Sequence, residues 1–360
     1  MKKIGVLTFH RAYNFGAVLQ AYALQRTIEK NGYDCQIIDY RNPKIEKWFH
    51  NATFKVKIKN LVKYILYHSH SVQVQKKGKR FKKFVSESMK LSKVYSCAEM
   101  FKDDYDAVVV GSDQVWNLDM TGGDMNFFLP YRCGARKLTY SASFGKSSVN
   151  DIYKEDVKKH LASFESLYVR EQDGVRLVRE LLDGVAEKTV DPTLLLDKDE
   201  WAKIKKPVET NGKYILLYFV AEQTNAIEIS KKMAAQKGCE VILIDPPRGG
   251  VDGVRNLMDV GPGEFLYLIE NAECVVTTSF HGLILSINHN TPFLFELSNK
   301  AQNTNSRLNE VNNTYGLEKY RITSDDISDY MGISYDWDSI NQKVFSQRKE
   351  SLDKLIVSLP

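Results

Sequence analysis

The chain has 360 residues, 43% of them hydrophobic and 26% charged, so it is long enough for two domains and apolar enough to bury a core in each. Its five cysteines are odd in number and far apart in the sequence, which argues against a disulfide framework and a cysteine-rich metal site. The net charge of +5 is unevenly distributed, because residues 44–93 carry fourteen Lys and Arg against two acidic residues.

The N-terminal residues predict a βαβ unit, with a strand at 4–9, a helix at 17–30 and a strand at 35–40. Apolar residues at spacings of four and three indicate the helix, and Gly32 marks its end. The first strand is too short for a signal-peptide core, and no apolar run approaches the ~18 residues that span a bilayer. We therefore expect a cytoplasmic protein.

Residues 44–93 interrupt the α/β alternation as a basic helical insert. Apolar side chains recur at helical spacing at Phe54, Ile58, Leu61 and Ile65, and a second helical stretch follows that is denser in lysine. One interpretation is a helix that contacts an anionic membrane surface at the inner face of the membrane. The other is a solvated basic face over an ordinary core. We do not expect nucleic acid as a partner, because the aromatic residues of this segment mostly recur at helical spacing, as core residues do.

The alternation of strands and helices then resumes and restarts after a polar boundary near 197–213. Strands are predicted at 107–110, 138–143, 167–169, 214–220, 240–244, 274–277 and 292–295. Helices are predicted at 151–164, 173–182, 224–237, 263–271, from 280, and at 305–315. The predicted fold is α/β, with two doubly wound Rossmann-like domains at 1–200 and 212–325 and a last helix at 337–358. A ligand cleft is expected between the domains, outside the carboxyl ends of their strands.

The loop TTSFHGL, residues 277–283, offers the strongest local site. Ser279 is a good N-cap for the helix that begins near Phe280, and a helix N-terminus can hold an anion. His281 in the first turn could donate a hydrogen bond to a phosphate or act as a general acid. The alternative interpretation is a capped helix with an incidental histidine.

Other polar residues follow predicted strands. Asn14 and Gly16 lie in a strand-to-helix loop that either lines the cleft and binds substrate or is an ordinary βα loop. Asp113 is placed to act as a general base or to bind sugar hydroxyls. Arg170 could clamp a carboxylate or phosphate, or could form a salt bridge, and Lys300 is a further cation. The remaining histidines lack metal-ligand spacing, so no metal is predicted.

Taken in order, five motifs resemble the polysaccharide pyruvyl transferase family over about residues 3–320. They are NFG at 14–16, GSDQVW at 111–116, YVRE at 168–171, DPT at 191–193 and TTSFHG at 277–282. The family is similar in fold to two-domain GT-B glycosyltransferases. The resemblance implies transfer of a pyruvyl unit from phosphoenolpyruvate onto two hydroxyls of one sugar, as a cyclic ketal. The acceptor would be a cell-surface polysaccharide or its lipid-linked precursor.

The resemblance also implies roles for individual residues. His281 matches the family's histidine at the phosphoenolpyruvate site, Arg170 its arginine, and Lys300 a downstream basic residue. Many members have arginine where this chain has Ser279. His281 would then act as the acid and Asp113 as the base. Phosphoenolpyruvate would be a co-substrate, and no cofactor is expected. A GT-B glycosyltransferase that uses a nucleotide sugar and a non-catalytic glycan-binding protein are the alternatives.

Overall fold

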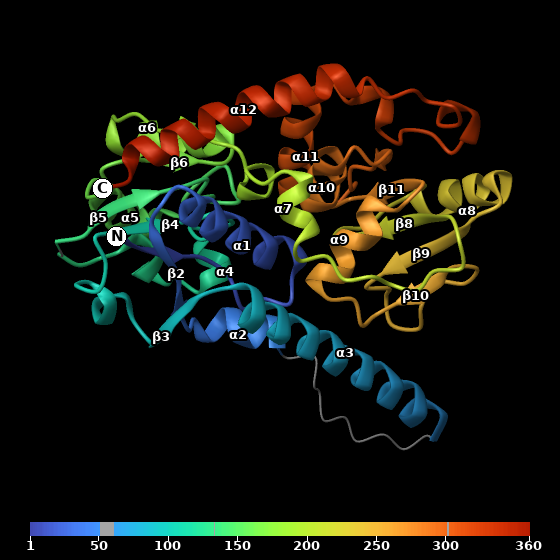
Figure 1. Ribbon diagram of the computed structural model, residues 1–360, viewed down its shortest axis with the longest axis horizontal. Coiled ribbons are helices and arrows are strands. Elements are labelled where there is room, and N and C mark those ends of the chain that lie inside the picture. The colour runs from blue at the N-terminus through green and yellow to red at the C-terminus, as the bar shows by residue number, and fades with distance from the viewer. Residues whose placement is uncertain (51–60, 133, 301) are drawn as a thin grey trace. The chain divides into compact units, whose positions relative to one another are not determined.

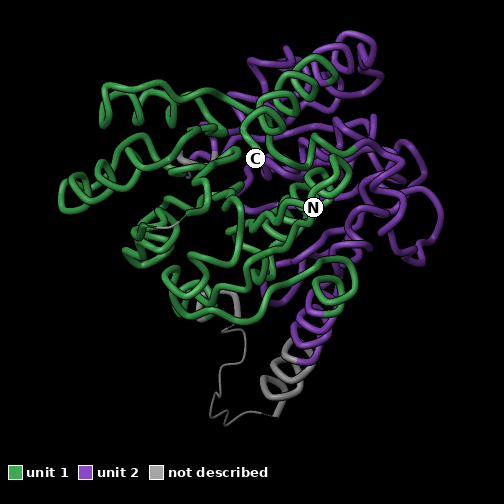
Figure 2. Tube along the Cα trace, turned by 60° about the vertical axis from the view of Figure 1, so that its left-hand side comes forward, with its two compact units in different colours: residues 1–51, 83–196, 345–360 green, residues 52–82, 197–344 purple. Residues whose placement is uncertain are grey.

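The computed structural model describes residues 1–50, 61–132, 134–300 and 302–360 (Figure 1). The chain divides into two compact units, which Figure 2 shows in different colours. Unit 1 comprises Met1–Asn51, Lys83–Leu196 and Phe345–Pro360, and unit 2 comprises Ala52–Lys82 and Asp197–Val344. Each unit therefore combines segments that lie far apart in the sequence.

Unit 1 is built on a five-stranded parallel sheet in the order β3-β2-β1-β4-β5. Its strands are β1 (Lys3–Leu7), β2 (Asp34–Tyr40), β3 (Leu91–Tyr95), β4 (Ala107–Val110) and β5 (Arg136–Thr139). A short parallel pair, β6 (Tyr168–Val169) and β7 (Glu187–Lys188), joins the β5 edge through a bridge between Leu138 and Ser166. Parallel sheets are covered on both faces, and β4, with the sequence AVVV, is accordingly buried along its whole length.

Helices and 3₁₀ turns connect these strands. They are α1 (Phe15–Lys30), α2 (Pro43–His50), α4 (Leu118–Thr121), α5 (Asp151–Leu161), α6 (Gln172–Leu182), η1 (Ala98–Phe101), η2 (Met125–Phe128) and η3 (Pro192–Leu194). Two longer helices, α3 (Leu61–Ser88) and α12 (Trp337–Ser358), contribute residues to both units. The core of unit 1 includes the stacked rings of Trp116 and Phe128, whose centroids are 5.6 Å apart.

Unit 2 repeats the same topology, with a parallel sheet in the order β10-β9-β8-β11-β12. Its strands are β8 (Tyr214–Tyr218), β9 (Glu240–Ile244), β10 (Arg255–Leu257), β11 (Cys274–Thr277) and β12 (Phe293–Phe295). Its helices and turns are α7 (Lys198–Ala202), α8 (Ala226–Lys237), α9 (Pro262–Glu270), α10 (Phe280–His289), α11 (Gln302–Tyr315), η4 (Glu318–Tyr320) and η5 (Ile327–Asp329). The prediction of two Rossmann-like α/β domains is confirmed.

In both sheets the chain begins in the middle, moves to one edge and then crosses to the other. The strand order therefore reverses between β1 and β4 in unit 1 and between β8 and β11 in unit 2. Open α/β sheets bind ligands at such switch points, outside the carboxyl ends of the strands. The loops after β1 and β4 in unit 1, and those after β8 and β11 in unit 2, therefore lie at the switch points.

The division into units differs from the contiguous ranges that the sequence suggested. Part of the basic insert belongs to unit 2, where Lys77 pairs with Asp245 and Arg80 pairs with Glu264. The last turns of α12 belong to unit 1. Phe54 and Ile58 lie outside the described residues, as do the side chains of Leu61 and Ile65. Among the helices that the structure describes, none has the length and apolar character needed to cross a membrane.

Candidate functional site

The loop after β11 has a geometry that its sequence explains. Ser279 is the N-cap of α10, and its side chain accepts a hydrogen bond from the Gly282 amide at 3.3 Å. The Thr277 hydroxyl accepts one from the Ser279 amide at 3.0 Å. A Cβ on residue 282 would lie 2.5 Å from the Thr277 hydroxyl oxygen, so this position requires glycine. The prediction of a capped helix N-terminus at Ser279 is confirmed.

Thr278 ties together the two loops of the unit 2 switch point. Its hydroxyl oxygen accepts hydrogen bonds from the amides of Val220 and Ala221, at 3.0 and 3.1 Å, in the loop after β8. The side chain is fully buried. These bonds fix the β8 loop against the start of α10.

His281 lies in the first turn of α10 and is buried, with 7% of its surface exposed. Its ring meets that of Phe280 edge-on, with the centroids 5.1 Å apart. The positive end of the α10 dipole favours an anion in this turn. A buried imidazole at such a place can donate a hydrogen bond or pass a proton to a bound anion.

Lys300 lies on the surface near the same loops. Its ammonium pairs at 2.7 Å with Glu222, in the loop after β8, and both side chains are largely exposed. The hydrogen bond that Lys300 donates to this carboxylate raises the pKa of Lys300. An exposed pair of this kind contributes little to stability, so the lysine can exchange Glu222 for another anion at small cost.

Glu296 is a buried carboxylate of unit 2 that sequence analysis missed. It follows β12 directly, and its own amide donates to the carbonyl of Thr277 at 3.0 Å. Its oxygens accept three hydrogen bonds, from the amides of Thr224, Asn225 and Ala226, at 3.0, 2.9 and 3.0 Å. An acidic residue at the end of the apolar run FLF was the available signal.

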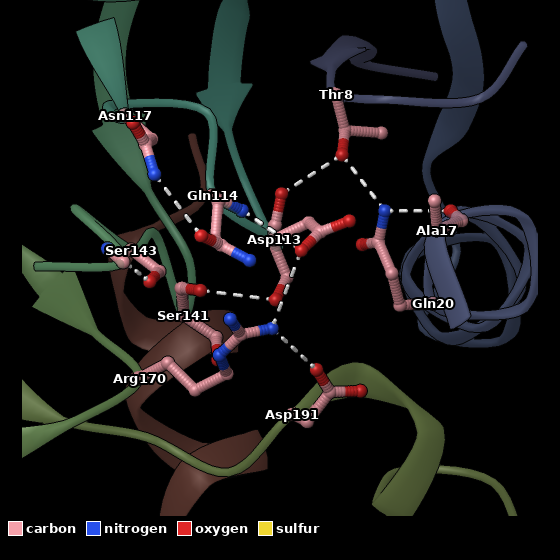
Figure 3. A network of polar contacts seen from close by, with 12 residues as sticks. Thr8, Ala17, Gln20, Asp113, Gln114, Asn117, Ser141, Ser143, Arg170 and Asp191 are labelled. Atoms are coloured by element: carbon pink, nitrogen blue, oxygen red, sulfur yellow. Dashed lines mark hydrogen bonds and ion pairs between the residues drawn. The ribbon is translucent and has the colours of Figure 1, made fainter. Parts of the chain in front are cut away.

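The unit 1 switch point is held together in a similar way. Thr8, which follows β1, donates a hydrogen bond to the carbonyl of Ser112, in the loop after β4, at 2.9 Å. Figure 3 shows Thr8 together with Gln20 of α1. The Gln20 amide on α1 donates to the Thr8 hydroxyl at 2.8 Å. All three residues are buried, so these bonds fix the β4 loop against the start of α1.

The backbone of this loop is unusual, because Asp113 has φ at 71° and Gly111, two residues earlier, has φ at 114°. A Cβ on residue 111 would lie 2.4 Å from the carbonyl oxygen of Tyr140, so the close approach of two backbones requires glycine. One carboxylate oxygen of Asp113 accepts a hydrogen bond from the Gln114 amide at 2.9 Å. The loop thereby directs Asp113 toward Arg170 (Figure 3).

Arg170 is buried among three carboxylates. Its guanidinium lies 3.2 Å from Asp191, 3.3 Å from Glu171 and 3.7 Å from Asp113. Burial opposes the charged form, but these carboxylates outweigh it, so the pKa of Arg170 lies above its ordinary value. Glu171 is itself fixed by the Ser143 hydroxyl. The predicted contact between Arg170 and a donor stays a prediction, while the geometry supports a role in holding Asp113.

Asn14 and Gly16 belong to the start of α1, which begins two residues earlier than predicted. The Asn14 side chain accepts a hydrogen bond from the Ala17 amide at 3.1 Å and so caps the helix. Gly16 is buried in the first turn. Their predicted contacts with a substrate stay predictions.

A polar cluster around Asp39, at the end of β2, was also missed. Arg41 binds the Asp39 carboxylate with two hydrogen bonds of 3.0 and 2.9 Å, and the His10 ring lies 3.3 Å away. Burial raises the pKa of Asp39, but the hydrogen bonds from His10 and Arg41 lower it by more. The pKa of Asp39 therefore lies well below its ordinary value. The cluster fixes Arg41 at the carboxyl edge of the sheet, although His10 carried no recognisable motif.

The structure thus groups the predicted residues within each unit. Asp113 and Arg170 are in contact in unit 1, whereas His281 and Ser279 share a helix turn in unit 2. The cleft between domains stays a prediction. In the described part of the chain, no group of three or more His, Cys, Asp and Glu side chains is arranged to hold a metal ion.

Comparison with known proteins identifies the family. The family model described as polysaccharide pyruvyl transferase matches residues 14–296. Among curated proteins, none matches the chain. Among solved structures, UGT89C1 from Arabidopsis thaliana is 11% identical, with 99% of each chain covered and a TM-score of 0.50. UDP-GlcNAc 2-epimerase from Methanocaldococcus jannaschii is 13% identical, with 98% of this chain and 93% of that chain covered and a TM-score of 0.47.

The structural comparison bears on the fold, whereas the family model is matched to the amino-acid sequence. The solved structure of UGT89C1 has the GT-B fold, in agreement with two α/β units that each carry a parallel sheet. At 11% identity, this likeness shows the fold alone. The family model spans most of the chain and includes Asn14, Asp113, Arg170 and His281. The chain therefore belongs to the polysaccharide pyruvyl transferase family and has a GT-B fold.

Proposed function

We propose that this protein transfers a pyruvyl group from phosphoenolpyruvate onto two hydroxyls of one sugar, forming a cyclic ketal. The observation that carries the proposal is the family match over 14–296, which includes His281 in the first turn of α10. Phosphoenolpyruvate is a small and highly charged anion. The positive end of α10, together with His281 and the exchangeable Lys300, offers it complementary charge.

The proposed reaction needs one acid and one base. Protonation of the methylene carbon makes the adjacent carbon electrophilic, and a sugar hydroxyl adds there. The carbon–oxygen bond to phosphate then breaks, and the second hydroxyl closes the ketal. Of the two hydroxyl protons, one is balanced by the proton gained at the methyl carbon and one leaves with phosphate. General acid–base catalysis of such steps contributes about 10²- to 10⁴-fold.

Each role is proposed for a residue with suitable surroundings. His281 would supply the proton to carbon or to the leaving phosphate, since it lies where the helix dipole attracts the donor. Asp113 would accept the hydroxyl proton, since its carboxylate is held by the Gln114 amide and by Arg170. Lys300 would balance the charge of the leaving phosphate.

The acceptor is proposed to be a sugar of a polysaccharide or of its lipid-linked precursor. The family description names a polysaccharide as the molecule that is modified. If the precursor is lipid-linked, the enzyme would work in the cytoplasm, at the inner face of the membrane. The lysines of α3 are the proposed contact with the anionic lipids there.

The test is incubation with phosphoenolpyruvate and a panel of nucleotide-linked and lipid-linked sugars. We expect phosphate release that depends on the sugar, together with an acid-labile product whose mass has increased by one ketal-linked pyruvate. A parallel series contains nucleotide sugars as the donor and no phosphoenolpyruvate. Transfer of a sugar in that series, with no phosphate released from phosphoenolpyruvate in the first, would replace the proposal by a glycosyltransferase.

A further inference from the structure

The carboxylate of Glu296 occupies the N-terminus of α8 from 70 residues away in the sequence. Its side chain is 4% exposed, and its two oxygens accept hydrogen bonds from three successive amides, those of Thr224, Asn225 and Ala226. The N-cap residue of the helix, Asn225, makes no such bond with its own side chain. The chain therefore places a carboxylate of its own at this helix end.

The loop that this carboxylate binds lies at the switch point of unit 2. The loop after β8 and the loop after β11 flank the point where the strand order of unit 2 reverses, which is where open α/β sheets bind their ligands. Free amides at a helix N-terminus in such a loop are a common binding site for phosphate. At α8 those amides already hold Glu296, whereas the first turn of α10 carries His281.

We propose that Glu296 determines donor specificity by excluding a second phosphate from unit 2. A diphosphate that reached both helix ends would have to displace three hydrogen bonds to a charged group and would meet its negative charge. A donor with one phosphate needs α10 alone. The inference rests on the proposed function for the identity of the donor, and it predicts rejection of nucleoside diphosphates.

A simple capping role for Glu296 predicts a different set of measurements. Loss of a cap lowers the melting temperature and leaves anion affinity unchanged. Loss of an excluding carboxylate also opens an anion site at the α8 amides. The gain of anion binding therefore separates the two roles.

The experiment compares wild type, Glu296→Ala and the isosteric Glu296→Gln at constant ionic strength. Inorganic pyrophosphate, UDP, phosphoenolpyruvate and acetate are titrated, and binding is followed by calorimetry and by the melting temperature. Glu264→Ala is the matched control, because Glu264 is also a buried carboxylate of unit 2 but pairs with Arg80 at 2.8 Å. Acetate serves as a replacement for the missing carboxylate.

We expect pyrophosphate and UDP to bind Glu296→Ala at least about tenfold more tightly than wild type, the scale of one charge-assisted hydrogen bond. Acetate should raise the melting temperature of this variant more than that of wild type or of Glu264→Ala. If Glu296→Ala does not fold, Glu296→Gln should still gain pyrophosphate affinity, because its charge is gone. Unchanged pyrophosphate affinity in the folded variants would overturn the proposal. A wild type that ignores phosphoenolpyruvate would instead count against the proposed function alone.

Discussion

At the scale of single residues, two buried groups matter most, and they differ in what surrounds them. His281 lies at the positive end of a helix, and Arg170 lies among three carboxylates. His281, at a helix end, can therefore act on a bound ligand directly. Arg170 is enclosed by carboxylates, so it acts by holding those carboxylates in place.

Replacing His281 by glutamine should lower turnover by about 10²-fold or more, the scale of lost acid catalysis, with little change in melting temperature. Glutamine has a similar volume and can still donate a hydrogen bond, but it cannot transfer a proton. His289→Gln, at the other end of α10, is the control and should keep its turnover at pH 7.5. Initial rates of phosphate release provide the measurement, and full activity in His281→Gln would contradict the assignment.

Replacing Arg170 by lysine should lower both the melting temperature and kcat while leaving the KM for phosphoenolpyruvate nearly unchanged. Lysine keeps the charge but cannot reach Asp191, Glu171 and Asp113 at once, so the proposed base would lose its fixed position. Steady-state kinetics and thermal unfolding measure the effects. A rise in donor KM alone, with stability unchanged, would instead show that Arg170 binds the donor.

The sequence predicts part of this site, and distance along the chain explains the rest. The N-cap at Ser279 depends on residues within one helical turn, so local spacing is sufficient to find it. Glu296 and Asp39 acquire their partners from loops that are remote in sequence. Their importance arises from burial and pairing, which no local pattern encodes.

At the scale of elements, the strand pattern explains which elements the sequence predicts well. Strands β4 and β8 are continuous apolar runs and are buried throughout, so their composition is unmistakable. Strands β3 and β10 are the edges of their sheets, and most of their residues are only partly buried or exposed. Edge strands need no apolar run, which is why both were missed.

Helix α10 should make the stability of unit 2 sensitive to mild acid. Burial lowers the pKa of His289, which donates a hydrogen bond to the Leu285 carbonyl at 2.9 Å. Between this lowered pKa and the unfolded value of about 6.5, the unfolded chain binds more protons, so stability falls as pH falls. We expect His289→Gln to lose less stability than wild type between pH 7.5 and 5.5 in urea unfolding. Parallel pH profiles would refute this.

Helix α3 carries an exposed lysine stripe, which we define as Lys76, Lys79, Lys82 and Lys83. All four side chains are exposed, and Lys83 also pairs with Glu87 at 3.7 Å. The neighbouring Lys77 and Arg80 are engaged in ion pairs with Asp245 and Glu264. The free energy of attraction to an anionic surface is on the order of 1 kcal/mol per lysine and is screened by salt. We therefore expect sedimentation with anionic vesicles at low salt and none with neutral vesicles.

Changing the lysine stripe to glutamine should abolish this sedimentation. The control replaces an equal number of exposed lysines away from α3, at Lys154, Lys158, Lys159 and Lys188 of unit 1, so that net charge falls equally. Equal loss in both variants would assign the effect to total charge. Recovery of wild type in the supernatant under all conditions would leave the stripe as a solvated face.

At the scale of the whole molecule, the fold class follows from the sequence but the allocation of segments does not. Alternating strands and helices predict two Rossmann-like units, since this pattern belongs to parallel sheets. The clustering of Phe345–Pro360 with unit 1 depends on contacts such as the bond from the Val190 amide to the Ser351 hydroxyl, at 3.0 Å. A domain boundary predicted from the sequence assigns only consecutive residues to one domain, so it could not place this distant segment in unit 1.

The end of α12 should therefore stabilise unit 1. Leu355 is fully buried, and Leu355→Ala should lower the free energy of unfolding by about 2–5 kcal/mol. Val357, only two residues away, is 82% exposed, so Val357→Ala should change it by less than about 0.5 kcal/mol. Urea unfolding followed by tryptophan fluorescence compares the two, and equal effects would show that this segment does not pack as described.

The three-segment construction of unit 1 has a consequence for protein synthesis. A ribosome makes Met1–Asn51 and Lys83–Leu196 early, but it makes Phe345–Pro360 only after all the residues of unit 2. The synthesis of unit 2 is thus complete before the last segment of unit 1 is begun, because its earlier segment, Ala52–Lys82, is made long before Phe345. Unit 1 must wait, with the surface that receives Leu355 uncovered. The unit that is begun first is finished last, and nascent chains stalled before residue 345 should be the ones that chaperones retain.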